Sequence, residues 1–137
     1  MLLLTICFSG MALATSVQPK PLEEMVREAD HVVIATVVSI DMFYGGARPV
    51  TDRDARTGPG LQKQLRFNLE VQEVLLARTT PTPHALRVPL WQMWSYTLGA
   101  MRDDVTSATG IFLLKGESYE PVYPSDFRRA LKERERR

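Results

Sequence analysis

The stretch LWQMWSY, Leu90–Tyr96, holds the side chains best suited to binding a ligand. If this stretch is a strand, Trp91 and Trp94 point to opposite faces, because side chains alternate along a strand. Two opposed indoles do not both fit inside a small barrel, so we expect one of them at an outer surface or in a groove. Aromatic faces stack on sugars and bases. The candidate ligand-binding residues are therefore Trp91, Trp94 and Tyr96. In the alternative, one tryptophan is core and the other packs under the first helix.

The histidines, serines and glycines form no recognisable catalytic or metal-binding pattern. His31 and His84 occur in no H-x-H or H-E-x-x-H spacing, so we expect no metal and no cofactor. Each is interpreted as an ordinary surface or boundary histidine. The sequence contains no G-x-S-x-G, and its glycines match neither G-x-G-x-x-G nor G-x-x-x-x-G-K.

Two acidic pairs lie in stretches that are interpreted as loops. Asp52 and Asp54 form the first pair, and Asp103 and Asp104 form the second. A calcium site needs about six to eight oxygen ligands, and Arg53 within the first pair weakens any cation site. We therefore expect solvated loops, and we predict a protein that is not an enzyme.

The N-terminus is typical of an export signal. An uncharged, mainly apolar run from Leu2 ends in the small-x-small pattern Ala12–Ala14, and it is too short to span a membrane. We predict a signal peptide over residues 1–14, a linker over 15–20, and an exported chain that is periplasmic or secreted and not an integral membrane protein. The less favoured alternatives are lipidation at Cys7 and a buried or disordered N-terminus. Cleavage after Ala14 leaves no cysteine and hence no disulfide.

Charge is uneven along the chain. Residues 128–137 hold six basic and two acidic residues, whereas the rest holds 11 basic and 14 acidic ones. The body of the protein is therefore not a nucleic-acid-binding surface on charge grounds. The basic tail is expected to be a solvated helical end, with contact to an anionic surface as the alternative.

The elements that position these residues follow from periodicity. Apolar residues at helical spacing predict a short helix over 21–29. The stretch 31–40 is apolar on both faces, with Val32, Val38 and Ile40 pointing one way and Val33 and Val37 the other, which predicts a covered central strand. Strict alternation of apolar and polar residues over 62–76 predicts a half-buried strand.

The whole pattern predicts a mainly β fold, a five-stranded OB-like Greek-key barrel over residues 21–124. The expected strands are 31–41, 62–76, 85–97, 110–115 and 119–123. A long loop is expected over 41–61, a further loop over 99–110, and a charged C-terminal helix or tail over 125–137, capped by Ser125.

This strand order resembles the netrin-like modules, which include the inhibitory domain of tissue inhibitors of metalloproteinases. The segments that carry the resemblance are Ala29–Val33, Val71–Leu76 and Gly110–Leu114. Those inhibitors chelate the protease zinc through an amino-terminal cysteine and are held by disulfides. The predicted mature chain has no cysteine, so no functional residue is carried over. The chain is also similar to small exported bacterial proteins, a class that supplies no activity to transfer.

We therefore predict a non-enzymatic binding or interaction module. Its partner would be an unknown protein or cell-envelope component, with no nucleic acid. The surfaces expected to bind are the loop over 41–61 and the stretch Trp91–Tyr96. The alternatives are a loop-based protease inhibitor of netrin-like architecture and a hydrolase with dispersed acids such as Asp52 or Asp103.

Overall fold

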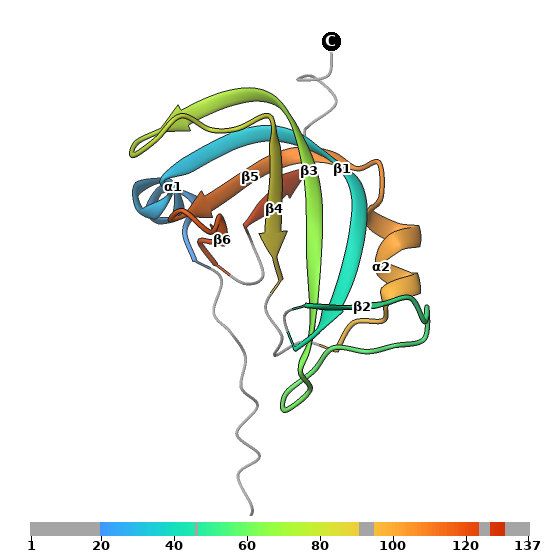
Figure 1. Ribbon diagram of the computed structural model, residues 1–137. Helices are drawn as coiled ribbons and strands as arrows, with labels where there is room; N and C mark the ends of the chain where they lie inside the picture. The colour runs from blue at the N-terminus through green and yellow to red at the C-terminus, as the bar shows by residue number, and fades with distance from the viewer. Residues whose placement is uncertain (1–19, 46, 91–94, 124–126, 131–137) are drawn as a thin grey trace, which may run out of the picture.

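The computed structural model describes residues 20–45, 47–90, 95–123 and 127–130. Over these residues the chain forms one antiparallel sheet with two helices (Figure 1). In chain order the elements are α1 (Leu22–Glu28), β1 (His31–Tyr44), β2 (Arg48–Val50), β3 (Lys63–Ala77), β4 (Ala85–Pro89), α2 (Leu98–Val105), β5 (Thr109–Lys115), β6 (Glu120–Pro121) and β7 (Arg128–Ala130). The predicted mainly β class is confirmed.

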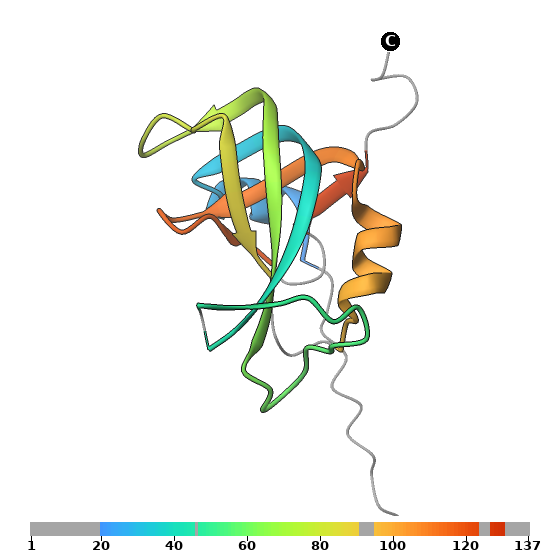
Figure 2. The same cartoon turned by 45° about the vertical axis from the view of Figure 1, so that its right-hand side comes forward.

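The sheet is built around β1. The strand order is β4-β3-β1-β5-β6, while β2 adds to the far end of β1 and β7 adds to β5. The sheet is strongly curled, and α2 lies along one side of it (Figure 2). Among the described strands, β4 and β6 are not paired with each other, so the sheet is open. The predicted closed five-stranded barrel is therefore not confirmed in that detail.

A bulge in β1 changes which residues face the core. Val37 pairs with Leu69 and Ser39 pairs with Asn68, so Val38 is an extra residue on the β1 side. An extra residue reverses the in–out alternation beyond it. Val37 is fully buried on one side of the bulge and Ile40 on the other, whereas Val38 is 48% exposed. The prediction that Val38 and Ile40 share a face is therefore wrong.

Helix α2 and the turn after it satisfy the backbone around this bulge. The N–H of Val37 donates to Ala108 O at 2.9 Å, and the N–H of Ser107 donates to Val37 O at 2.7 Å. Arg102 of α2 donates from Nε to Ile40 O at 3.0 Å. These bonds matter because unpaired backbone groups inside a protein are costly.

Helix α2 was missed in the sequence. Of the predicted strand 85–97, the described residues form β4 at Ala85–Pro89, and most of the helix Leu98–Val105 lies in the stretch 99–110 that was expected to be a loop. Thr97 caps this helix, since its Oγ1 accepts from the N–H of Ala100 at 3.2 Å. Leu98 and Val105 are buried in the main core, seven residues apart on one helical face.

The other covering elements follow the predictions more closely. The predicted helix 21–29 is confirmed as α1, whose Met25 packs with Val32 and Leu113 in a second, smaller core on the outer side of β1 and β5. Val33 lies in the main core, so β1 is covered on both faces there, as predicted. The alternation over β3 is confirmed by the buried residues Leu65, Phe67, Leu69 and Val71.

The predicted closing helix is wrong where the structure describes it. Arg128–Ala130 form β7, which pairs with β5. Just before β7, the Phe127 ring lies 6.1 Å from Phe112 and 6.4 Å from Phe67, centroid to centroid, which anchors the strand in the core. Ser125 and residues 131–137 lie outside the described residues. The strand predicted over 119–123 is present in part, as β6 at Glu120–Pro121, which pairs with β5.

The bulge can be tested with two neighbouring valines. Val37→Ala is expected to lower the free energy of unfolding by about 2–3 kcal/mol, because Val37 is fully buried. Val38→Ala, the matched control, is expected to cost less than about 1 kcal/mol because its side chain is half exposed. Urea denaturation of both variants measures the difference. Equal losses would contradict the bulge.

Candidate functional site

Of the three predicted ligand-binding residues, only Tyr96 is described. Trp91 and Trp94 lie outside the described residues. The chain enters that segment beside β3, since the N–H of Leu90 donates to Leu65 O at 2.9 Å. Tyr96 is half-buried against the main core, and burial raises the pKa of its phenol above the ordinary value.

The loop over 51–61 is held against the residues around Tyr96, and we call it the clamped loop. The N–H of Thr57 donates to Tyr96 O at 2.9 Å, and the N–H of Tyr96 donates to Thr57 Oγ1 at 3.1 Å. Further along, Leu98 N–H donates to Ala55 O at 3.1 Å and Gly99 N–H to Arg53 O at 2.9 Å. The sequence predicted these two segments as separate binding surfaces. The structure brings them into contact.

The acidic pairs in these loops have structural partners. Asp103 accepts from Arg53 at 2.7 Å, and this ion pair, which joins the clamped loop to α2, raises the pKa of the Arg53 guanidinium. The pair is well exposed, so its contribution to stability is small. Asp52 Oδ1 accepts from the N–H of Asp54 at 2.9 Å, which shapes the turn. Within the described ranges, no group of three or more His, Cys, Asp or Glu side chains is arranged to hold a metal ion.

His31 is a core residue, so the prediction of a surface or boundary histidine is wrong for it. Its side chain is fully buried at the start of β1. Nδ1 lies 2.8 Å from Thr82 Oγ1 in the β3–β4 loop, and the ring lies 5.1 Å from the Tyr119 ring in the β5–β6 turn, centroid to centroid. Apart from the apolar run that follows His31, nothing in the sequence indicates this burial.

Asp30 strengthens the same junction. Its Oδ2 accepts from the N–H of Gly116 at 2.7 Å, and its carbonyl accepts from the N–H of Arg78 at 2.9 Å. Asp30 and His31 together therefore hold the β3–β4 loop and the β5–β6 turn to the start of β1. The residue type at Asp30 belongs to the pattern that carried the netrin-like resemblance, and its role here is structural.

His84 is exposed, and it lines a small open pocket at the β3–β4 turn. The volume is about 110 Å³, and the lining residues are Val71, Gln72, Glu73, Val74, Thr82, Pro83 and His84. Nδ1 of His84 lies 3.3 Å from Val71 O. A pocket of this size is too small for a drug-sized ligand, which occupies about 300 Å³ or more.

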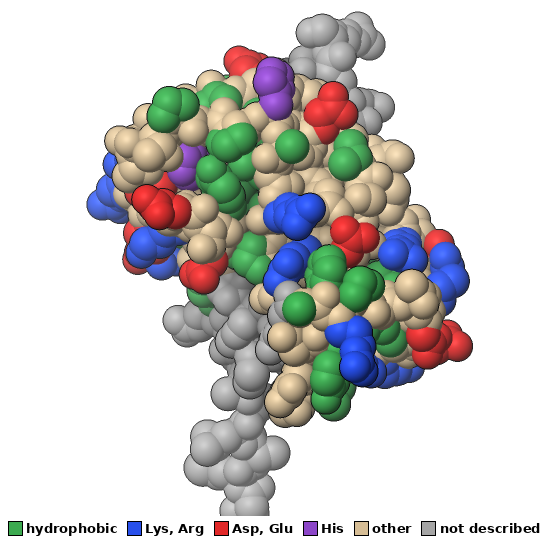
Figure 3. Space-filling model, viewed as in Figure 1, with side chains coloured by type: hydrophobic (Ala, Val, Ile, Leu, Met, Phe, Trp, Pro, Cys, Tyr) green, Lys and Arg blue, Asp and Glu red, His purple; other side chains and the backbone are tan. Residues whose placement is uncertain are grey.

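A second candidate surface is the ribbon tip, formed by residues 43–45, 47–49 and 61–64 at the ends of β1, β2 and β3. Tyr44 is the cross-strand partner of both Arg48 and Lys63. Directly opposed residues share one face of a sheet, about 4.5–5.5 Å apart at Cβ. Tyr44 is 45% exposed and so is Leu61. Figure 3 shows cationic and apolar side chains gathered at this lower end of the molecule.

Most of the ribbon tip lies within the loop over 41–61 that the sequence predicts as a binding surface. The prediction of an irregular loop is wrong there, since Phe43 and Tyr44 end β1 and Arg48 begins β2. The stretch FYGGAR, with two aromatic residues before a glycine pair and an arginine, could have pointed to this part of the loop.

Beyond the ribbon tip, the outer face of β1 and β3 is tied by side-chain hydrogen bonds. Asn68 Nδ2 donates to Asp41 Oδ2 at 2.7 Å and to Ser39 Oγ at 2.8 Å. Gln72 Nε2 donates to Thr36 Oγ1 at 2.7 Å. These groups satisfy one another, which leaves the ribbon tip as the more available surface.

We compared the chain with known proteins. No protein-family model, curated protein or solved structure matches the chain. Neither helix in the described part of the chain is long and apolar enough to cross a membrane.

The melting temperature of Tyr96→Phe is expected to fall less steeply with rising alkaline pH than that of the wild-type protein. Burial raises the pKa of the Tyr96 phenol in the folded state above its unfolded value of about 10. The neutral phenol therefore contributes stability below the unfolded pKa, and this contribution is lost as pH rises through the folded pKa. Melting temperatures of both proteins between about pH 8 and pH 11 measure the slope. Tyr44→Phe, at an exposed position, is the control. An unchanged slope in Tyr96→Phe would contradict the assignment.

Proposed function

We propose that the chain is an exported, non-enzymatic binding module that acts through the clamped loop and the adjoining aromatic stretch. The observation that carries this proposal is the pair of hydrogen bonds between Thr57 and Tyr96, one to the Tyr96 carbonyl and one to the Thr57 hydroxyl. It holds two segments that are far apart in sequence in one arrangement. A loop that is ordered before binding loses less conformational entropy on binding, so more of its contact energy contributes to affinity.

The partners of the acidic residues support binding over hydrolysis. The Asp103 carboxylate accepts a hydrogen bond from Arg53, and the Asp52 carboxylate accepts one from the N–H of Asp54. A general acid or base needs a carboxyl group within reach of a substrate proton and with a suitable pKa. An exposed ion pair and a turn contact are the ordinary roles of surface carboxylates.

We also propose that the curled sheet is a partly open OB-like barrel. The strands β1, β3 and β4 follow one another as antiparallel neighbours, and β5 returns to lie beside β1. This is the order of a Greek key. Residues of β4 and β6, the two edges that a barrel would join, lie near each other. Folds of this kind bind oligosaccharides and oligonucleotides on the second and third strands and adjoining loops.

Export is part of the proposal and rests on residues 1–14, outside the described part of the chain. The small-x-small pattern at Ala12–Ala14 supports cleavage there. Amino-terminal sequencing of the protein recovered from the producing cells tests it, and a first residue of Thr15 is the expected result. An uncleaved chain would contradict export through this signal.

The binding proposal can be tested with the chain's own fluorescence. Its two tryptophans, Trp91 and Trp94, lie in one short segment, so the emission reports on that segment alone. A panel of glycans and peptides is expected to contain a ligand that shifts this emission and raises the melting temperature. Trp91→Ala or Trp94→Ala is expected to weaken that binding about fivefold or more, as for an interface anchor.

Circular dichroism of the two variants is the control. A native melting temperature with weakened binding supports the proposal. Unfolding of both variants would assign the aromatic stretch to the core and remove it as a binding surface. Inhibition of a protease at micromolar concentration, or turnover in a hydrolase screen, would replace the proposal with one of its two alternatives.

A further inference from the structure

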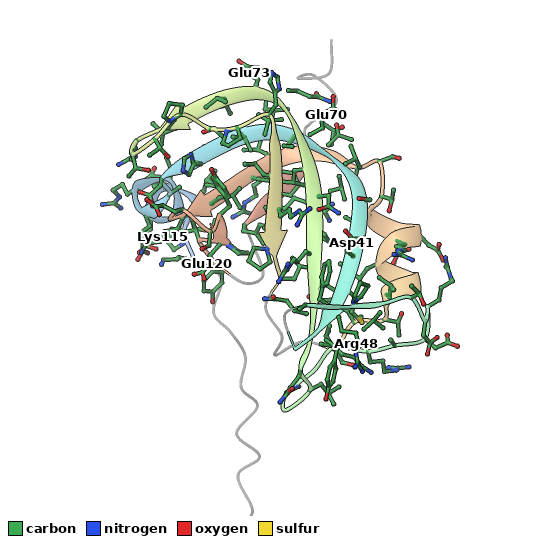
Figure 4. The ribbon with its side chains drawn as sticks, viewed as in Figure 1. Asp41, Arg48, Glu70, Glu73, Lys115 and Glu120 are labelled. Carbon is green, nitrogen blue, oxygen red and sulfur yellow. The ribbon has the colours of Figure 1, made fainter. Side chains whose placement is uncertain are left out.

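The ribbon tip is locally cationic although the chain as a whole is nearly neutral. The residues of the ribbon tip include Arg48 and Lys63 and no aspartate or glutamate, and the nearest acidic residues in the chain are Asp41, Asp52 and Asp54. Glu70 and Glu73 lie at the opposite end of β3 from Arg48 (Figure 4). An anionic group that approaches the tip therefore meets no opposing carboxylate from the tip residues.

One row of the tip combines the cations with an aromatic ring. Tyr44 stands between Arg48 on β2 and Lys63 on β3, and antiparallel pairing fixes this order. Arg48 and Tyr44 are exposed, and Lys63 is half-buried. Among the described residues, neither cation has a carboxylate within ion-pair distance. The row thus consists of the half-exposed Tyr44 ring with the positively charged side chains of Arg48 and Lys63 on either side.

An aromatic–cation contact lies on the opposite face of the ribbon from Tyr44. The Arg66 guanidinium, next to the tip, lies 4.6 Å from the centroid of the Phe43 ring. Stacking of this kind holds a guanidinium in a defined position.

We propose that the ribbon tip binds an acidic polysaccharide whose sugar units carry carboxylates. A sugar ring stacks on the exposed face of Tyr44, and a carboxylate on that sugar or its neighbour pairs with Arg48 or Lys63. This inference goes beyond the proposed function, because the ribbon tip is a different surface from the one formed by the clamped loop and the aromatic stretch.

The size of the charged row favours a sugar polymer over nucleic acid. Binding to a duplex releases counterions along many phosphates and requires an extended track of Lys and Arg. Here one row supplies two cations, and the net charge of the whole chain is only +1. A polysaccharide with a carboxylate on alternate or successive sugars can pair with two cations spaced along one row.

The test is a titration of the full chain with polygalacturonate, with dextran as the neutral polymer. Wild-type protein is expected to bind polygalacturonate and not dextran, and binding is expected to weaken with added salt. Arg48→Gln and Lys63→Gln are each expected to weaken binding about fivefold, as for an exposed charge pair. Tyr44→Ala is expected to weaken it about tenfold, and Tyr44→Phe to restore it, because the stacking face is kept.

Arg87→Gln is the matched control, since Arg87 is an exposed arginine of β4 outside the tip. Binding of this variant is expected to equal the wild type, and melting temperatures of all variants are expected to stay native. Absence of polygalacturonate binding, equal binding of dextran, equal binding of duplex DNA, or equal loss in Arg87→Gln would each overturn the inference. If another ligand still shifts tryptophan emission, the binding module stands and only this ligand class is wrong.

Discussion

The structure depends on the backbone pairing of β1 around its bulge. Because Val38 is an extra residue, the odd-numbered side chains of β1 face the main core before Val38, and the even-numbered ones face it after Val38. The bonds from Ser107 and Arg102 then satisfy backbone groups on each side of the bulge. Helix α2 is therefore fixed by the same irregularity that lets a 14-residue strand curl around one core. The position of α2 in turn fixes the clamped loop through the pairing of Leu98 with Ala55.

Much of the fold could be predicted because its signals are local. The alternation in β3 and the apolar stripe of α1 follow from side-chain periodicity alone. The missed elements depend on contacts distant in sequence. Leu98 and Val105 carry the helical period of α2, but Gly99 and the acidic residues between them are typical of a loop. Residues of β7 lie in a charged stretch that favours a helix, and pairing with β5 overrides that preference.

The candidate site was predictable in its parts and not in its arrangement. Sequence pointed to the loop over 41–61 and to Tyr96, and the contact between them came only with the structure. The regular structure of the ribbon tip was not predicted because a glycine pair is typical of a break, whereas the residues on either side of it pair as β1 and β2. The burial of His31 was not predicted either. A polar residue before an apolar run looks like a boundary, yet its partners Thr82 and Tyr119 come from two distant turns.

The placement of β1 also has a consequence for how the chain folds. β1 pairs with β5 on one edge, and the hydroxyls of Thr36 and Thr109 that meet there are 73 residues apart. During synthesis that edge of β1 stays unpaired until β5, Thr109–Lys115, has been made. Folds dominated by such distant pairings form slowly, in about milliseconds to seconds. A chain with this topology therefore exposes unpaired strand edges to chaperones for longer than a helical protein of similar length.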